Sequence, residues 1–287
     1  MTAISLHLGL NHVSPSHYGS DQPLLNPVND AQAMHNLATG LGYQSSMLLD
    51  SDATVLGLST ALAQASDVLQ PDDTFLLTYA GHGSQMFDQT GDEPDSLDET
   101  WCLYDRMILD DELFGLYARF RQGVRVVVVS DSCHSGTVAR ALSLDDIKAL
   151  DPEVAYPDPR DPLTEIGLES PLRFRSLSNV FSRSTYLANK QQYDEAKVLS
   201  AAVSGMELQC SLLLLAACQD NQLASDGEGN GYFTSWLLHF WNEGAFAGSY
   251  TDIFNQLNAA MPRRQKPNLL PLGRDTDALQ SRRAFII

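Results

Sequence analysis

The stretch VRVVVVSDSCHSG, residues 124–136, constrains the fold more than any other part of the chain, and five of its first six residues are valine. An unbroken apolar run of this kind is typical of a strand that is buried on both faces of a parallel sheet. The run ends at Asp131, Cys133 and His134. Because ligand sites of open α/β sheets lie beyond the carboxyl ends of the strands, we predict a reactive site here.

The rest of the chain alternates between strand-like and helix-like segments. We expect strands at Ala3–Leu10, Tyr43–Leu49, Thr74–Ala80 and Ser211–Cys218, and an edge strand at Arg283–Ile287. Apolar residues recur at helical spacing in Asn29–Leu41, Val55–Leu69 and Asp110–Phe120, and we expect a further helix at Thr234–Trp241. This alternation predicts an α/β fold with a mostly parallel central β-sheet that is flanked by helices on both faces.

The segment 142–204 interrupts the alternation with a proline-rich, mixed-charge stretch. Loops this long are usually functional or disordered, and we interpret this one as a linker or insertion within one sheet. We therefore predict a single domain, 1–287, that consists of a portion 1–141, the linker 142–204 and a smaller portion 205–287.

Charge and cysteine content limit the partners and the compartment. Eighteen basic and 36 acidic residues give a net charge of −18, which opposes binding to nucleic acid or anionic lipid and favours basic peptides or divalent cations. No apolar run reaches the roughly 20 residues that cross a bilayer, and we interpret the N-terminus as a first strand rather than an export signal. The four cysteines form no CxxC pair, so we expect a reducing cytoplasm.

A second motif, TFLLTYAGHGSQ, ends another apolar run with His82 between two glycines. A parallel neighbouring strand would place His82 at the same sheet edge as Cys133. A cysteine nucleophile needs a nearby base, so we predict Cys133 as nucleophile and His82 as base. The backbone amides of Gly83 and Cys133 are candidate oxyanion donors. Taken singly, a buried cysteine or a lone histidine is more often structural, and only the pairing favours catalysis.

Six stretches occur in order along the chain: YAGHGSQ, GDEPDSLDETWCLYD, LDDEL, SDSCHSGT, AACQDNQLASDGEGNGYFT and MPRRQKPN. On these residues the chain resembles the caspase/metacaspase superfamily of cysteine peptidases, close to the bacterial metacaspase-like proteins called orthocaspases. His82 precedes Cys133 by 51 residues, which is similar to the caspase spacing. DSCHSG differs from the QACRG-type block of animal caspases and is closer to metacaspases. The resemblance implies a caspase-like fold and a cysteine endopeptidase that works through an acyl-enzyme.

Two aspartates are candidates for a substrate pocket. Asp131 lies two residues before Cys133 and projects to the same side of an extended strand. Asp30 also suits the N-cap of a helix, so the residues alone leave its role open. The resemblance implies that both form a pocket for Arg or Lys, and bidentate pairing favours Arg. Some metacaspases carry serine where this chain has Ala80, so the pocket is either less polar here or completed elsewhere.

Further acidic residues suggest two weaker sites. Asp220 and Asp226 are candidates to line the substrate cleft, although a solvated acidic surface explains them slightly better. Ten of the 25 residues from Asp88 to Glu112 are acidic, which suits Ca²⁺. The candidate ligands are Asp95, Asp110 and Asp111. The resemblance implies a further aspartate seven residues after the nucleophile, but Arg140 stands there and opposes calcium. We therefore expect no required cofactor, with calcium left open.

The linker offers sites for self-processing of a zymogen. Its basic residues are Lys148, Arg160, Arg173, Arg175, Arg183, Lys190 and Lys197, and RFRSLSNVFSR is the most suggestive stretch. Two alternatives to a peptidase remain: a catalytically silent scaffold of the same fold, and a non-peptidase thiol hydrolase or acyltransferase. The resemblance to metacaspases implies a monomer.

Overall fold

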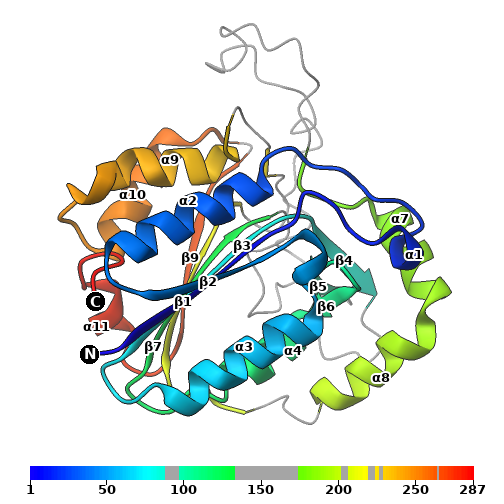
Figure 1. The fold of residues 1–287 in the computed structure, drawn as a ribbon, viewed down its shortest axis with the longest axis horizontal. Helices are drawn as coiled ribbons and strands as arrows, with labels where there is room; N and C mark the ends of the chain where they lie inside the picture. The colour runs from blue at the N-terminus through cyan, green and yellow to red at the C-terminus, as the bar shows by residue number, and fades with distance from the viewer. Residues whose placement is uncertain (88–96, 133–173, 202–205, 219–223, 226–228, 264) are drawn as a thin grey trace, which may run out of the picture.

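The computed structural model describes residues 1–87, 97–132, 174–201, 206–218, 224–225, 229–263 and 265–287. Its centre is a six-stranded sheet in the order β2-β1-β3-β7-β8-β9 (Figure 1). The strands are β1 Ala3–Gly9, β2 Gln44–Leu49, β3 Thr74–Ala80, β7 Arg125–Asp131, β8 Ser211–Ala216 and β9 Asn268–Gly273. The first five strands are parallel and β9 is antiparallel to β8, so the predicted mostly parallel sheet is confirmed.

Helices cover both faces of this sheet, as predicted (Figure 1). One face carries α3 (Val55–Val68) and α4 (Asp110–Tyr117), and the other carries α2 (Pro27–Gly40), α9 (Tyr232–Trp241) and α10 (Tyr250–Ala260). The valine run of β7 explains the two cores. Val126 and Val128 pack with the α3 side, whereas Val127 and Val129 pack with the α2 side. Because both faces of β7 are packed against apolar cores, the strand has no solvent-facing position for a polar residue, and its apolar run is continuous.

The prediction of an edge strand at 283–287 is wrong. The edge strand is β9, and among the described residues the tail makes one β contact, a bridge between Arg283 and Ser249. Ala284 and Phe285 are fully buried in the core beside α10 and the short helix α11 (Thr276–Gln280), so the apolar tail fills the core instead of pairing. Pro271 lies in β9, which an edge strand tolerates because its outer side needs no N–H donor.

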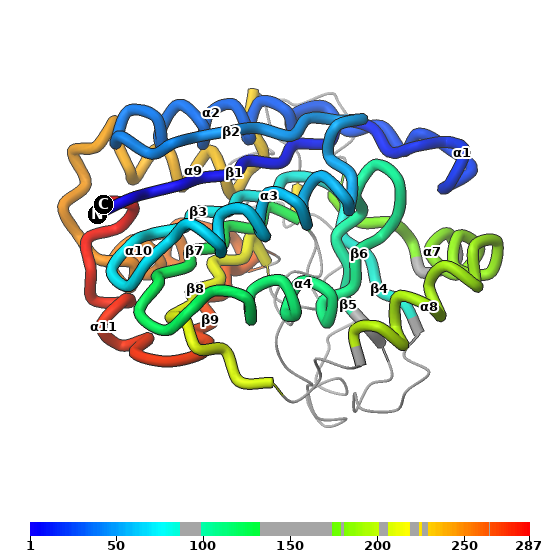
Figure 2. Tube along the Cα trace, turned by 60° about the horizontal axis from the view of Figure 1, so that its bottom comes forward, coloured from blue at the N-terminus to red at the C-terminus, as the bar shows by residue number. Residues whose placement is uncertain are grey.

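A smaller unit lies at one end of the main sheet (Figure 2). It contains the antiparallel strands β4 (Gly83–Phe87), β5 (Leu97–Cys102) and β6 (Met107–Leu109), the short helix α1 (Pro15–Tyr18), and helices α7 (Asn179–Ala188) and α8 (Lys190–Ala201). Leu177, Tyr186 and Tyr193 pack here against Met86 and Met107. The described end of the predicted linker is therefore helical and packed, while the division into three portions stays a prediction.

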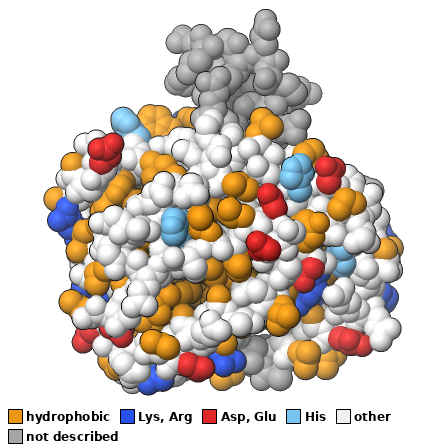
Figure 3. All heavy atoms as spheres, viewed as in Figure 1, with side chains coloured by type: hydrophobic (Ala, Val, Ile, Leu, Met, Phe, Trp, Pro, Cys, Tyr) orange, Lys and Arg blue, Asp and Glu red, His pale blue; other side chains and the backbone are white. Residues whose placement is uncertain are grey.

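Figure 3 shows the surface of the molecule from the same side as Figure 1. Acidic and basic side chains are scattered over this side, and neither kind forms one large patch. Among the described residues, no helix is long and apolar enough to span a membrane.

Candidate active site at the carboxyl ends of β3 and β7

Strands β3 and β7 are parallel neighbours, and the register pairs Ala80 with Asp131 at their carboxyl ends. The predicted histidine follows Ala80 by two residues, as the predicted cysteine follows Asp131, so the two strands that precede them are parallel neighbours as predicted, while the catalytic pairing stays a prediction. Cys133 itself lies outside the described residues. What the structure describes of the site is therefore the histidine and the surroundings of the two aspartates.

His82 is held with one ring nitrogen facing a backbone carbonyl. Its side chain is largely buried, and Nε2 lies 2.8 Å from the carbonyl oxygen of Gln22. Because a carbonyl oxygen can only accept, Nε2 carries the hydrogen and the neutral imidazole has its basic lone pair on Nδ1. Gln22 has a left-handed backbone, with φ of 40°, so the loop that orients the histidine adopts an uncommon conformation.

The backbone of His82 is held by Tyr79, which stacks on Trp101. Tyr79 donates its hydroxyl hydrogen bond to the carbonyl oxygen of His82 at 2.7 Å, and its ring stacks on Trp101 with centroids 4.4 Å apart. A Cβ atom at Gly81 would lie 2.7 Å from the Tyr79 hydroxyl oxygen, so the first glycine of the GHG motif makes room for this contact.

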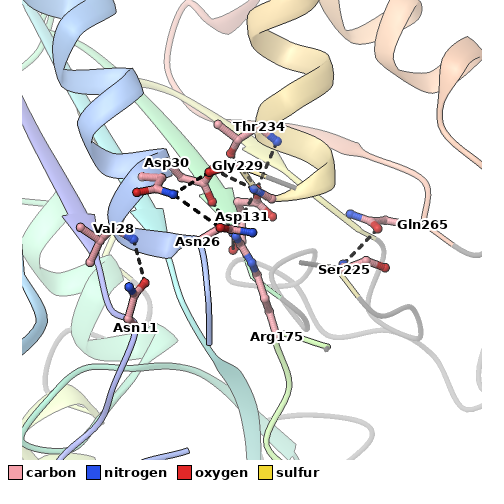
Figure 4. A network of polar contacts seen from close by, with 12 residues as sticks. Asn11, Asn26, Val28, Asp30, Asp131, Arg175, Ser225, Gly229, Thr234 and Gln265 are labelled. Atoms are coloured by element: carbon pink, nitrogen blue, oxygen red, sulfur yellow. Dashed lines mark hydrogen bonds and ion pairs between the residues drawn. The ribbon is translucent and has the colours of Figure 1, made fainter. Parts of the chain in front are cut away.

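Asp30 and Asp131, 101 positions apart in sequence, lie together around the guanidinium of Arg175 (Figure 4). Nη2 of Arg175 is 2.5 Å from Oδ2 of Asp30, and Nη1 is 3.1 Å from Oδ2 of Asp131. Nη1 also donates to the backbone carbonyl of Asp131 at 3.0 Å. All three side chains are buried, Arg175 completely. The two predicted pocket residues thus bind a basic side chain that belongs to the chain itself.

Each carboxylate is held by donors other than the arginine. Gly231 N–H donates to Oδ1 of Asp30 at 2.9 Å, and Thr234 donates to Oδ2 of Asp131 from its N–H at 3.1 Å and from Oγ1 at 2.6 Å. We call Asp30, Asp131, Gly231 and Thr234 the carboxylate pocket. Thr234 belongs to α9 and contributes a hydroxyl group to the pocket, whereas Ala80 carries no polar side chain.

The N-cap alternative for Asp30 is wrong. Asn26 precedes α2, Pro27 occupies the first helical position, and Asp30 lies later in the first turn with its side chain buried. The neighbouring Asn29 donates to the carbonyl oxygen of Gly229 at 2.7 Å, so the Asn-Asp pair holds the 229–231 loop at two points (Figure 4).

Two features of the carboxylate pocket are unusual: the pKa of Asp30 and the space beside Gly231. Burial raises the pKa of Asp30 to about 7, against the lowering effect of the Arg175 charge, and the nearby Asp131 raises it further. A Cβ atom at Gly231 would lie 2.4 Å from Nη2 of Arg175 and 2.6 Å from Oδ2 of Asp131. Glycine at this position therefore leaves the space that the guanidinium fills.

The backbone of Arg175 is bound as well as its side chain. Its N–H donates to the carbonyl of Ala224 at 2.9 Å, and its own carbonyl accepts from Gly83 N–H at 2.9 Å. Leu177 N–H donates to the carbonyl of Gly83 at 3.1 Å. Gly83, predicted as an oxyanion donor, thus contacts the carbonyl that follows the buried basic side chain.

The remaining predicted site residues divide into two groups. Asp95, Asp220 and Asp226 lie outside the described residues, although Ala224 and Ser225 between the last two contact Arg175 and Phe174. Asp110 and Asp111 form the first turn of α4. In the described part of the chain, no group of three His, Cys, Asp or Glu residues could hold a metal ion, so calcium binding stays an untested prediction.

Sequence reasoning missed Gly231, Thr234 and the role of Arg175. Gly231 lies in the glycine-rich DGEGNGYF loop, which was recognised only as a loop, and Arg175 was one of seven basic residues of the linker. Gln265, within the MPRRQKPN stretch, accepts from Ser225 N–H at 3.1 Å and so supports the segment that pairs with Phe174 (Figure 4).

The chain is similar to known proteins over most of its length. Residues 12–276 match the family described as Caspase domain (Peptidase_C14). Metacaspase-1 of Saccharomyces cerevisiae is 27% identical over 259 residues, which cover 82% of this chain and 57% of that protein. Metacaspase-1 of Kluyveromyces lactis is 25% identical, with coverage of 92% and 65%. The chain thus spans about three fifths of the length of these relatives.

A solved structure extends the likeness to the whole chain. The crystal structure of protein GSU0716 from Geobacter sulfurreducens has a TM-score of 0.84 and 36% identity, and the match covers 100% of both chains. Since the family model covers most of the sequence, the chain belongs to the caspase domain family of the caspase/metacaspase superfamily.

Proposed function

We propose that the protein is a cysteine endopeptidase that cleaves peptide bonds after arginine, and less readily after lysine. One observation carries this proposal: the carboxylate pocket binds the side chain of Arg175 while Gly83 N–H binds the carbonyl of the same residue. A peptidase must hold both the side chain that it selects and the carbonyl that it attacks. This arrangement does both for a basic residue, beside His82.

Cys133 is the proposed nucleophile and His82 the proposed base. The thiolate of Cys133 attacks the substrate carbonyl, the amides of Gly83 and Cys133 stabilise the oxyanion, and His82 gives its proton to the leaving amine. Water then hydrolyses the acyl-enzyme. The other three cysteines, Cys102, Cys210 and Cys218, are free thiols but buried. Burial raises the pKa of Cys210 to about 12, which keeps that thiol protonated and unreactive.

The geometry favours arginine over lysine. The two terminal nitrogens of Arg175 contact two different carboxylates and one carbonyl. A guanidinium has a fixed fork of donors for such a site, whereas a lysine ammonium is one compact charge. We therefore expect kcat/KM to be higher for arginine than for lysine at the cleaved bond, by about tenfold.

A pocket of this chemistry also separates the peptidase from its alternatives. A silent scaffold needs no site that binds a basic side chain and its carbonyl together, and a general thiol hydrolase has no use for two buried aspartates. We further propose that the protein is a cytoplasmic monomer that acts on peptides or proteins, requires no cofactor and is made as a zymogen that processes itself within 142–204.

The test is hydrolysis of fluorogenic peptides that end in Arg, Lys or Asp, by the wild type and by Cys133→Ala, each with calcium and with chelator. We expect Arg peptides to be cleaved and the activity to be absent from Cys133→Ala. Cleavage after Asp would contradict the role of the carboxylate pocket. The chelator arm decides whether calcium is needed, and equal rates in both arms would exclude Asp95, Asp110 and Asp111 as ligands of an activating ion.

A further inference from the structure

The segment 174–177 lies against the site residues as a bound substrate would. We propose that Arg175–Ser176 is the bond that the chain cleaves in itself, and that until this cut Arg175 excludes other basic residues from the carboxylate pocket. This inference rests on the proposed peptidase function and adds to it a specific cleavage site and a cause of latency.

The side chain of Arg175 fills the carboxylate pocket completely. It is 0% exposed, and it lies between both carboxylates, which are themselves buried. Gly231 gives the guanidinium its space, with an added Cβ meeting Nη2 at 2.4 Å. A second guanidinium therefore cannot enter while Arg175 is bound, so a substrate has to displace it.

The backbone around Arg175 is bound as an extended strand. Phe174 forms an antiparallel bridge with Ser225, and Ser176 forms a parallel bridge with Gly83. Extended peptides are commonly bound by such strand pairing, in which main-chain bonds fix the register and a pocket selects the side chain. Here the register puts the carbonyl of Arg175, and hence the Arg175–Ser176 bond, at the amide of Gly83 beside His82.

The two sides of this bond are held very differently. On the following side, Leu177 is 2% exposed within the core of the smaller unit, and Ser178 caps α7 by accepting from Phe181 N–H. On the preceding side, Phe174 is 40% exposed. After a cut, Ser176 and Leu177 are expected to stay in place, whereas Arg175 can leave the pocket with the segment that precedes it.

Other basic residues of the described linker do not fit this role. Arg183 lies in α7, and Lys190 and Lys197 lie in α8. The N–H and C=O groups of a helical backbone are hydrogen-bonded within the helix, so such a segment cannot pair with Gly83 or Ser225 as an extended strand unless the helix unfolds. Among the described basic residues of 142–204, only Arg175 is extended and contacts both aspartates.

The cleavage step follows from the proposed function. The thiolate assigned to Cys133 forms a thioester with the Arg175 carbonyl carbon as the bond to the Ser176 nitrogen breaks, and that nitrogen takes a proton from the imidazolium of His82. Water then releases the Arg175 carboxylate and restores the thiol. No oxidant, reductant or further reactant is needed.

The experiment uses the full chain as wild type, Arg175→Ala, Arg175→Lys and, as a control, Arg183→Ala on the exposed side of α7. Each is followed in time by mass spectrometry of new N-termini and by hydrolysis of an external Arg peptide. We expect the wild type and the control to produce a chain that begins at Ser176, with a lag in hydrolysis that ends as the cut completes.

Arg175→Ala should show no such product and no lag. Its initial rate should exceed that of the uncut wild type by roughly tenfold, the competition expected from a tethered ligand at millimolar effective concentration.

The possible outcomes separate the two proposals. Hydrolysis by all variants, with the cut elsewhere and a lag unchanged in Arg175→Ala, would overturn this inference and leave the peptidase intact. If a folded Arg175→Ala chain loses hydrolysis and Arg175→Lys restores it, the ion pairs of Arg175 with Asp30 and Asp131 are a permanent structural requirement, and this inference is overturned. Absence of hydrolysis and of self-cleavage in every variant would overturn the proposed function and this inference together.

Discussion

Strand β7 has a buried arginine at each end, and the two are held in different ways. At its amino end, Arg125 is 7% exposed and donates to Thr74 Oγ1 at 3.1 Å and to the carbonyl of Asp72. Its carboxylate partner, Asp72, is 3.6 Å away and 81% exposed. At the carboxyl end, Arg175 meets two carboxylates that are each only 2% exposed.

The difference lies in what holds the partners. The groups around Arg125 are its own neighbours on adjoining strands and a loop, and burial lowers the pKa of Arg125. Asp30 and Asp131 are instead oriented by Gly231 and Thr234. These bonds do not involve the arginine, so we expect the carboxylate pocket to keep its shape when Arg175 leaves. The first arrangement serves the fold, and the second is suited to recognition.

The largest effect is expected from Asp131→Asn, which keeps the shape of the side chain and removes its charge. Breaking a buried ion pair on one side costs about 3–5 kcal/mol, so kcat/KM for Arg peptides should fall by at least ~100-fold. The assay is best made in chains that also carry Arg175→Ala, so that the internal arginine does not compete.

Arg125→Met provides the matched control at the other end of β7. It should lower the free energy of unfolding by about 1–3 kcal/mol in denaturant titration and leave kcat/KM unchanged. A loss of activity in Arg125→Met equal to that in Asp131→Asn would show that the two ends of the strand do not differ in function.

Gly231→Ala should rank second, because the added methyl group fills the space of the guanidinium. In the Arg175→Ala background we expect kcat/KM for Arg peptides to fall by ~10- to 100-fold through a higher KM, at an overpacking cost of about 1–3 kcal/mol. Gly40→Ala is the control, since a Cβ there meets nothing within 4 Å. Unchanged KM in Gly231→Ala would mean that a substrate arginine binds elsewhere.

Much of the fold could be predicted because its main strands are buried on both faces. The valine run of β7 and the apolar run before His82 predicted parallel neighbours, and Ala80 does lie opposite Asp131. The edge strand could not be found in the same way. β9 contains Pro271 and pairs on one side only, whereas Phe285 belongs to an apolar tail that resembles a strand but fills the core.

The carboxylate pocket was only partly predictable, because its bonds join distant residues. Asp131 could be placed by its spacing from Cys133, whereas Asp30 needed the family resemblance to exclude a helix cap. Gly231 bonds to a residue 201 positions away and Thr234 to one 103 positions away. No local pattern reports such contacts. The sequence also showed seven basic linker residues without indicating which one is bound.

Thr234→Val tests whether Asp131 has to be oriented as well as charged. The change removes the 2.6 Å bond from Oγ1 and leaves the longer bond from the backbone N–H. A hydrogen bond to a charged group contributes about 1.5–3 kcal/mol, so kcat/KM should fall by roughly tenfold or somewhat more. Thr234→Ser keeps the hydroxyl and should retain most of the activity. Equal losses in both variants would point to packing of the methyl group instead.

The smallest expected effect is the pH dependence of KM, which reports on Asp30 rather than on Asp131. Burial raises the pKa of Asp30 to about 7, so its carboxylate gains a proton and loses its charge as the pH falls through this value. Because a bound guanidinium lowers this pKa, the empty pocket gains its proton at a still higher pH, and KM for Arg peptides in the Arg175→Ala background should rise severalfold as the pH falls toward about 7. Protonation of the proposed base His82 would act on the chemical step and hence on kcat, so KM is the quantity to compare. In Asp30→Asn the KM should be higher throughout and no longer change with pH. A KM that still rises as the pH falls in Asp30→Asn would assign the titration to another group, and the carboxylate pocket would then depend on Asp131 alone.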